Sequence, residues 1–218
     1  MRARLGPLTS RKLVPLVCLA LAGAAASYIL QSNRAVGRYV GDAAAAMQIL
    51  SESRSPATSR GAADLTVVAF TDYQCPACRR ADPAMRRALA RDGNVRLVYK
   101  DWPIFGDRSV RAAQVALAAD RQGIYPSVHH ALMRAPRLDD AAMRDAVEQA
   151  GGSWEQIERV LAKHRPWILG QLERNRVQAF TLGLEGTPGY LVGPFLIKGA
   201  MSEGEFLRAF SQARDKLP

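Results

Sequence analysis

Two cysteines separated by two residues, Cys75 and Cys78, are the side chains of this sequence best suited to do chemistry. They follow an apolar, β-branched run at residues 65–70 and precede residues 79–91, which lack glycine and carry apolar side chains at helical spacing. This order predicts a buried strand, then the cysteine pair, then a helix. Cys75 then falls at the helix N-terminus, where unpaired N–H groups and the helix dipole stabilise a thiolate. The pair is therefore predicted to be a redox site.

The residues around the pair favour this interpretation. Pro76 has no N–H to leave unpaired, and its fixed φ suits the first helical turn. Cys78 lies on the same face of the predicted helix as Cys75, close enough to close a disulfide.

Two other uses of the cysteines are open. A structural zinc site needs four thiolate or imidazole ligands, and a structural disulfide across so short a loop adds little stability. The histidines His129, His130 and His164 and the remaining Cys18 form no second pair with zinc-ligand spacing. We therefore expect no metal and no cofactor, and we expect His129 and His130 to be ordinary helix residues.

The composition indicates one globular domain with an appendage. The chain has 218 residues, of which 48% are hydrophobic and 23% charged, and its formal net charge is +10. Basic residues in the body of the chain are interleaved with acidic ones at helical spacing, as in residues 155–163. This pattern favours solvated helix faces over a nucleic-acid surface, so we expect no nucleic acid as a partner.

The N-terminus carries the pattern of an export segment. Residues 1–12 are a basic leader, and residues 13–30 contain no charged side chain. The leader is expected to stay in the cytoplasm, so the chain after residue 30 is predicted to be exported. A cleaved signal peptide and a retained membrane anchor are both consistent with residues 13–30. Outside the cytoplasm, a paired dithiol is expected to cycle through a disulfide.

The rest of the chain divides into a linking segment and a folded domain. Residues 31–63 are expected to hold a short helix, capped by Asp42, and a linker rich in Ser, Pro and Gly. The domain is predicted to span residues 64–218. A second strand at residues 95–100 completes a strand–helix–strand order, which predicts a parallel pair with a crossover helix.

A long helical stretch then interrupts the sheet. The stretch from about residue 105 to residue 183 shows no strand pattern, which predicts a helical subdomain whose first helix is capped by Ser109. The sheet is expected to resume at residues 189–198 as a hairpin turning at Gly193 and Pro194. Residues 203–216 are expected to form a closing amphipathic helix with four apolar residues on its buried side, Phe206, Leu207, Phe210 and the neighbouring Leu217.

Five segments occur in an order that resembles a known family. They are residues 70–78, residues 101–104 (Asp-Trp-Pro-Ile), the alanine-rich helix after Ser109, residues 184–188 (Leu-Glu-Gly-Thr-Pro) and residues 199–202 (Gly-Ala-Met-Ser). Over residues 64–218 the chain resembles the DsbA-like thiol–disulfide oxidoreductases of the thioredoxin superfamily. The resemblance implies an α/β thioredoxin-like fold with an inserted helical subdomain, here preceded by the N-terminal signal or anchor helix.

The resemblance also implies roles for individual residues. Cys75 is expected to be the exposed nucleophile and Cys78 the buried resolving thiol. The Thr187–Pro188 bond is expected to be cis, with the Thr187 backbone turned toward the cysteines to pair with an extended client chain. Tyr73 and Trp102 are candidate client contacts as well, although aromatic residues in such positions more often belong to the core. The implied setting is the periplasm, with unfolded or partly folded exported proteins as clients and a membrane partner that resets the dithiol.

The chain departs from the best-known oxidase of that family near the cysteines. Ala77 stands where that enzyme has a thiolate-stabilising histidine, and Ala69 stands where it has a buried acid. We expect Pro76, Ala77 and Asp72 to tune the Cys75 thiolate, although Asp72 can equally cap the turn into the helix.

These departures bear on the direction of the reaction. Without the histidine, the Cys75 pKa is expected to fall less than in the strongest oxidases. Thr187 also differs from the valine of those enzymes. We favour the oxidase direction slightly, with a reductase, isomerase or relay as the alternative. A membrane-anchored polypeptide-binding module with an incidental dithiol is an alternative of another class.

Overall fold

The computed structural model describes residues 15, 17–23, 36–59 and 61–217. The contacts divide the chain into two units, Met1–Ala35 and Val36–Pro218. Of the uncharged segment 13–30, residues 17–23 are helical, and most of the remainder lies outside the described residues. Within the described part of the chain, no helix combines the length and the apolar character needed to span a bilayer.

A six-stranded mixed sheet forms the centre of the unit Val36–Pro218, with the order β1-β6-β5-β3-β4-β2. β3 (Leu65–Thr71) pairs in parallel with β4 (Val95–Asp101) and antiparallel with β5 (Gly189–Val192). The connection between β3 and β4 is α3 (Pro76–Asp92), so the predicted strand–helix–strand unit is confirmed. β5 and β6 (Phe195–Lys198) pair antiparallel, which confirms the predicted hairpin.

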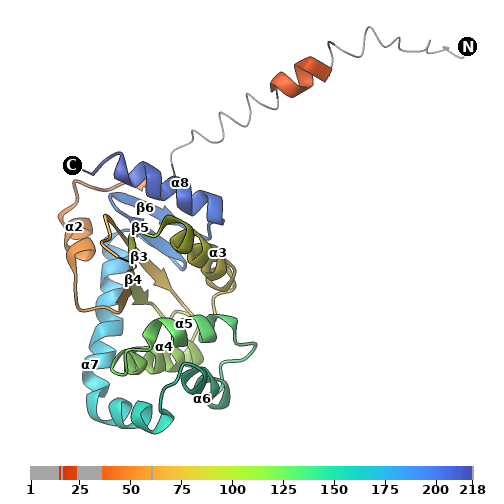
Figure 1. Ribbon diagram of the computed structural model, residues 1–218. Helices are drawn as coiled ribbons and strands as arrows, with labels where there is room; N and C mark the ends of the chain where they lie inside the picture. The colour runs from red at the N-terminus through yellow and green to blue at the C-terminus, as the bar shows by residue number, and fades with distance from the viewer. Residues whose placement is uncertain (1–14, 16, 24–35, 60, 218) are drawn as a thin grey trace, which may run out of the picture. The chain divides into compact units, whose positions relative to one another are not determined.

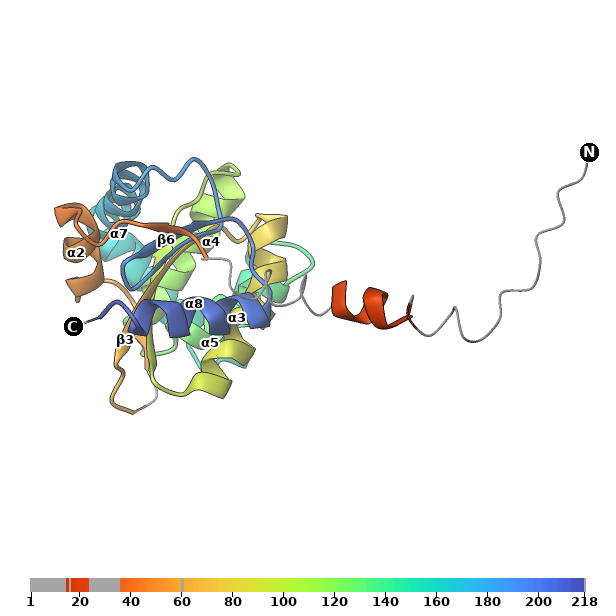
Figure 2. The same ribbon diagram turned by 90° about the horizontal axis from the view of Figure 1, so that it is seen from above.

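Helices cover both faces of this sheet (Figure 1). Successive side chains of β3 point to opposite faces, so Val67 and Ala69 join one apolar cluster, and Val68 and Phe70 join another. The first cluster includes buried residues of α3 and of α8 (Glu203–Arg214), which lie next to each other in Figure 2. The second includes residues of α2 (Ala44–Ser51) and of the end of α7 (Trp154–Thr181).

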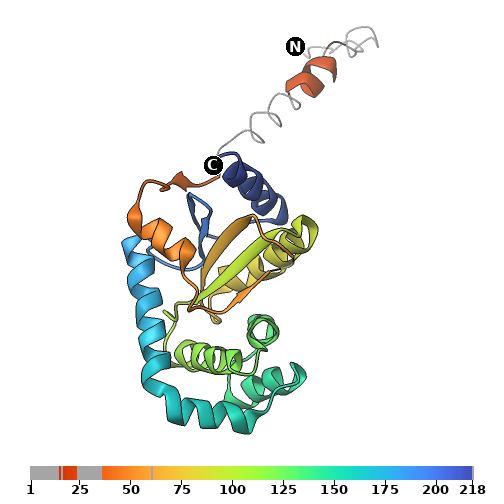
Figure 3. The ribbon, with the colours of Figure 1, turned by 60° about the vertical axis from the view of Figure 1, so that its left-hand side comes forward.

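The inserted helical subdomain consists of α4 (Asp107–Asp120), α5 (Tyr125–Arg134), α6 (Asp140–Gln149) and the first part of α7. Figure 3 shows α7 bending and continuing along the sheet. α7 is one element with non-helical backbone at His164. Pro166 follows two residues later, and a proline inside a helix removes a hydrogen bond and clashes with the preceding turn, which accounts for the bend.

The segment before residue 64 was predicted to be a helix and linker, and this prediction was incomplete. β1 (Arg38–Tyr39) pairs with β6, and β2 (Ala57–Thr58) pairs with β4, so both edges of the sheet come from this segment. Two-residue strands are too short to show an alternating pattern in the sequence.

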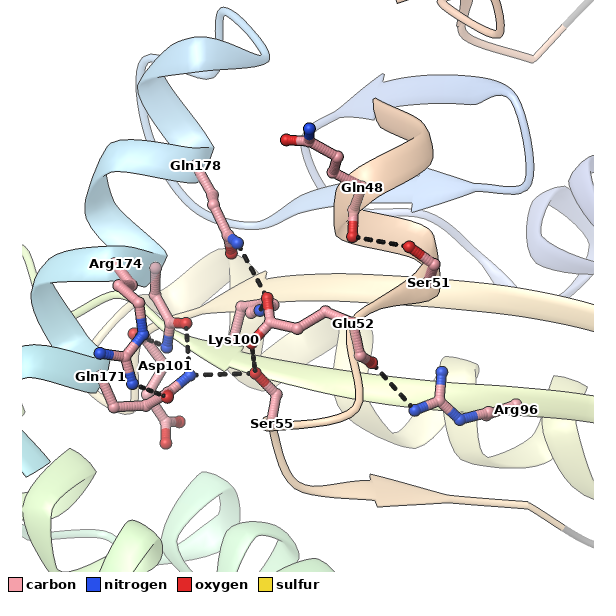
Figure 4. A network of polar contacts seen from close by, with 11 residues as sticks. Gln48, Ser51, Glu52, Ser55, Arg96, Lys100, Asp101, Gln171, Arg174 and Gln178 are labelled. Atoms are coloured by element: carbon pink, nitrogen blue, oxygen red, sulfur yellow. Dashed lines mark hydrogen bonds and ion pairs between the residues drawn. The ribbon is translucent and has the colours of Figure 1, made fainter. Parts of the chain in front are cut away.

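A buried polar network fastens the same segment to the sheet (Figure 4). The fully buried Lys100 of β4 forms an ion pair with Glu52, just after α2. The Glu52 carboxylate also accepts a hydrogen bond from Gln178 Nε2 of α7 at 2.8 Å, and Ser55 Oγ accepts one from Gln171 Nε2 at 3.0 Å. The segment is therefore held by β4 and α7 together.

Two expected helix caps were wrong, and the closing helix is shorter than expected. α2 begins after Ala43 with no side-chain cap, so Asp42 does not cap it. Ser109 lies inside α4 and is buried. Its hydroxyl donates to the Asp72 carboxylate and does not cap the helix. On α8, Phe206 and Phe210 are buried as expected, whereas Leu217 lies beyond the helix and is 40% exposed.

Candidate active site

Cys75 occupies the N-cap position of α3, directly after the turn that leaves β3. Its backbone N–H donates to the Asp72 carbonyl oxygen at 3.2 Å, and its carbonyl accepts from the Arg79 N–H at 3.1 Å. The Cys78 N–H points back at the Cys75 sulfur at 3.3 Å. Pro76 is the first helical residue, as its lack of an N–H favours. The unpaired donors of the first helical turn are therefore directed at one sulfur.

This environment separates the two thiols. The hydrogen bond with the Cys78 thiol, aided by the N–H groups of Cys78 and Ala77, outweighs burial and lowers the pKa of Cys75 to about 6. Burial raises the pKa of Cys78 far above its ordinary value, and the neighbouring Cys75 adds to the effect. At neutral pH, Cys75 is therefore the thiolate and Cys78 the protonated thiol.

Both cysteines carry free thiols, and both are buried. Cys75 was expected to be exposed, but only 2% of it is accessible, close to the 1% of Cys78. The reason is the loop before β5: the Cys75 thiol donates to the Thr187 carbonyl oxygen at 3.2 Å. A client must reach the sulfur beside this loop.

The Thr187–Pro188 peptide bond is cis, as the resemblance implied. Thr187 is half-buried and Pro188 is buried. The Pro188 carbonyl accepts the Gly199 N–H at 2.8 Å, which ties the loop to the end of β6. The tertiary fold thus brings Thr187 next to Cys75 across 112 positions of sequence.

Asp72 holds the turn and the loop beside it. Its carboxylate accepts hydrogen bonds from the Gln74 N–H at 2.7 Å and the Ser109 hydroxyl at 2.7 Å. It also accepts the N–H groups of Ile104 at 2.6 Å and Phe105 at 3.1 Å. These contacts show that Asp72 caps the turn, because each carboxylate hydrogen bond comes from a backbone N–H or from Ser109 of α4. An effect of Asp72 on the Cys75 thiolate stays a prediction.

Tyr73 and Trp102, considered both as client contacts and as core aromatics, are core residues. Tyr73 is 1% exposed, and its hydroxyl lies 3.0 Å from His129 Nδ1 and 3.4 Å from the Tyr125 hydroxyl. Trp102 is 2% exposed and packs edge-on against Phe180, with ring centroids 5.4 Å apart. Large aromatic rings beside the end of a buried strand commonly fill the interior, which was the favoured of the two interpretations.

The loop between β4 and α4 exposes two apolar side chains that the sequence analysis did not select. Ile104 is 43% exposed and Phe105 is 50% exposed. Gln74, the residue before Cys75, donates to the Phe105 carbonyl at 2.9 Å, so this apolar pair lies beside the cysteine turn. The sequence signal that could have identified them is a pair of apolar residues in the loop between a predicted strand and a predicted helix, because loop side chains are commonly exposed.

Asp82 is another residue near the site that the sequence analysis did not select. It lies one helical turn after Cys78 on α3, and with His129 and His130 it forms a group of possible metal ligands that excludes both cysteines. His130 Nδ1 lies 2.9 Å from the Asp82 carboxylate. A cavity of about 20 Å³, large enough for one water molecule, lies among Cys78, Asp82 and His129.

The fold and the site together define a class of protein. A thioredoxin-like sheet with a Cys-x-x-Cys pair at a helix N-terminus, facing a cis-proline loop, is the architecture of thiol–disulfide oxidoreductases. Residues 66–211 match the family described as the DSBA-like thioredoxin domain, and the chain belongs to that family. Membership confirms the predicted thioredoxin-like α/β fold, though not the signal or anchor helix expected before it, and it confirms the assignment as a protein-disulfide oxidoreductase.

Solved structures agree. A thioredoxin-like oxidoreductase from Silicibacter pomeroyi is 33% identical, with a TM-score of 0.73 over 78% of this chain and 98% of that one. A periplasmic thioredoxin-like protein from Salmonella enterica is 25% identical, with a TM-score of 0.66 over 78% of this chain and 97% of that one.

The curated relatives are much longer proteins. An Na⁺/H⁺ antiporter NhaA 3 from Salinispora tropica is 29% identical over 161 residues, which are 70% of this chain and 24% of the relative. The chain thus spans about a quarter of the length of the curated relatives it matches.

Proposed function

We propose that this oxidoreductase acts outside the cytoplasm and exchanges disulfides with unfolded or partly folded polypeptides through Cys75 and Cys78. The observation that carries the proposal is the position of the Cys75 sulfur, 3.3 Å from the Cys78 N–H and 3.2 Å from the Thr187 carbonyl. The Cys78 N–H stabilises negative charge on the sulfur. The Thr187 carbonyl on its other side is a backbone group with which an extended chain can pair.

In the oxidising direction, a client thiolate attacks the Cys75 sulfur of the Cys75–Cys78 disulfide. A client–Cys75 disulfide forms, the Cys75–Cys78 bond breaks, and Cys78 leaves as a thiolate that takes up a proton. A second client thiolate then attacks the client sulfur of the mixed disulfide and releases the Cys75 thiolate. The client loses two electrons and the dithiol gains them.

In the reducing direction, the Cys75 thiolate attacks a client disulfide and expels one client thiolate. Cys78 loses its proton, attacks Cys75 and releases the second client thiolate. The buried Cys78 has a raised pKa, so this second step needs a proton acceptor nearby.

The oxidising direction is slightly favoured. A lowered Cys75 pKa stabilises the reduced protein by about 1.4 kcal/mol for each pKa unit, and a stable reduced form makes the disulfide a better oxidant. The Cys75 pKa of about 6 is lowered less than in the strongest oxidases, whose cysteine has a pKa of about 3.5. The alternative of a reductase, isomerase or relay follows from the same comparison.

The proposed compartment is the periplasm. The charge pattern of residues 1–30 and the likeness to a periplasmic thioredoxin-like protein support it. A membrane partner that restores the redox state of the dithiol belongs to the same proposal. Antiport is not part of it, because the match covers only about a quarter of the curated relatives.

The reduction potential of Cys75–Cys78 in the full chain, equilibrated in glutathione buffers, tests the function and its direction. Cys18 is replaced by Ser so that the pair alone is oxidised. A potential of about −120 mV supports the disulfide donor, and one of about −270 mV supports the reductant. The absence of a reversible couple would overturn the enzyme assignment. A Cys75→Ser variant that still retains all activity would instead support the polypeptide-binding module.

A further inference from the structure

A groove beside the cysteine turn carries an excess of positive charge. Its volume is about 600 Å³, and two residues that flank Cys75 in sequence, Gln74 and Pro76, line it. Its other lining residues come from α3, α4 and the segment between α5 and α6: Arg79, Arg80, Arg108, Pro136, Arg137, Leu138 and Asp139. Four arginines against one aspartate leave the lining positively charged.

Two of these arginines are already used by the fold. Arg79 donates to the carbonyl oxygens of Tyr73 at 3.1 Å and Leu132 at 3.5 Å, and it also bonds to the Ala135 carbonyl. Arg137 Nε forms an ion pair with Asp139 at 3.2 Å. Arg79 fastens α3 to α5, and Arg137 is neutralised locally.

The other two arginines are available to a ligand. Arg80 on α3 and Arg108 in the first turn of α4 are exposed, and neither has an ion-pair partner among the described residues. The N-terminal end of α3, where Pro76 is the first residue, adds the positive end of a helix dipole to the same groove.

From this groove we infer that the enzyme prefers client segments with acidic side chains close to the reacting cysteine. The inference rests on the proposed exchange function and names its substrate class. A carboxylate beside a thiolate raises the thiol pKa by like-charge repulsion, and pairing with Arg80 or Arg108 removes that cost as the client docks. The exposed Phe105, next to Gln74, offers an apolar contact on the adjoining loop.

Other anionic ligands fit the groove less well. It adjoins the residue on each side of the reacting cysteine, and its volume corresponds to a few residues of extended chain rather than to a broad surface. In the part of the chain that the structure describes, unpaired arginines occur elsewhere on the domain as well, such as the exposed Arg208 of α8. Arg80 and Arg108 differ from them because they line the same groove as Gln74 and Pro76, the two neighbours of the reacting cysteine.

The test compares three single-cysteine peptides that differ only at the positions on either side of the cysteine: both Glu, both Gln or both Lys. The measurement is the second-order rate constant with which each peptide opens the Cys75–Cys78 disulfide of the full chain carrying Cys18→Ser. At low salt, the Glu peptide is expected to react about tenfold faster than the Gln peptide, and the Lys peptide more slowly. The Glu-to-Gln ratio should shrink at about 0.5 M salt.

Variants decide whether the groove is the cause. Arg80→Gln combined with Arg108→Gln should bring the Glu-to-Gln rate ratio close to one. Arg208→Gln, at an exposed position on α8, is the matched control and should keep the ratio. Equal rates for all peptides with the unaltered groove, or a ratio that survives in the double variant, would overturn the inference. Lack of reaction with every peptide would contradict the proposed function itself, so the two failures are distinguishable.

Discussion

The Cys75 thiol donates a hydrogen bond to the carbonyl oxygen of Thr187 at 3.2 Å, across the gap between α3 and the loop before β5. In the free thiol form, this carbonyl is therefore occupied by the nucleophile. Once Cys75 is part of a disulfide it has no proton to donate, and the carbonyl becomes available to a backbone N–H of the client. The thiolate, which predominates above about pH 6, has no proton to donate either. The carbonyl is therefore occupied only by the protonated thiol and is free to pair with a client chain when Cys75 is ionised or oxidised.

The first prediction concerns the ionisation of Cys75. Because its pKa is lowered to about 6, the thiolate should form between about pH 5 and 7. Thiolate absorbance or the rate of alkylation, measured in the Cys18→Ser background, should rise through that interval. An apparent pKa near 9 would show that the helix end and Cys78 have no net effect.

Cys78 should be the main cause of that lowered pKa. Replacing Cys78 with Ala removes the side-chain hydrogen bond that contributes most to it, so the Cys75 pKa should rise. Replacing Cys78 with Ser keeps a donor at the same place and should keep the pKa nearer to about 6. Indistinguishable alkylation profiles for the two variants would contradict this explanation.

A third prediction concerns Asp72. Asp72→Ala leaves the N–H groups of Gln74, Ile104 and Phe105 without their acceptor. Loss of this network should lower the free energy of unfolding by about 3 kcal/mol, measured by urea denaturation. Asp72→Asn keeps one acceptor oxygen and should cost less. Equal losses for the two variants would show that the hydrogen bonds matter less than the charge.

The buried Asp101 should make stability depend on pH. Burial, partly offset by the hydrogen bonds from Tyr125 and Tyr73, raises the pKa of Asp101 from 3.8 to about 7. Between these values the folded state binds more protons than the unfolded state, so this group's contribution to the free energy of unfolding falls as pH rises. Above about pH 7, it changes no further.

Asp101→Asn removes the titration and keeps an acceptor for the Tyr125 hydroxyl. The difference in unfolding free energy between variant and parent should therefore grow in favour of the variant from about pH 4 to 7 and then level off. Asp145→Asn, at an exposed position on α6, is the matched control. A difference that does not change with pH would contradict the raised pKa.

The pair formed by Glu52 and Lys100 yields a fifth prediction. Glu52→Ala leaves the Lys100 ammonium group buried without its counter-charge and should cost about 3–5 kcal/mol of unfolding free energy. Glu52→Gln combined with Lys100→Met removes both charges and should cost distinctly less. If the double variant is as unstable as Glu52→Ala, shape rather than charge holds the N-terminal segment to the sheet.

The sequence by itself determined the local features of this protein. The apolar run of β3, the cysteines at the start of α3 and the turn after β5 all follow from short-range rules of hydrophobic period, helix ends and turn residues. These rules located the two cysteines and, with the family resemblance, the Thr187 loop.

Only the tertiary structure decided which neighbouring side chains fill the interior and which face solvent. Tyr73 and Trp102 are buried while Phe105 is exposed, and Ser109 bonds to Asp72 rather than capping its own helix. The edge strands β1 and β2 exist because they pair with β6 and β4. Each of these outcomes depends on contacts between residues far apart in the chain, whose partners a local pattern does not specify.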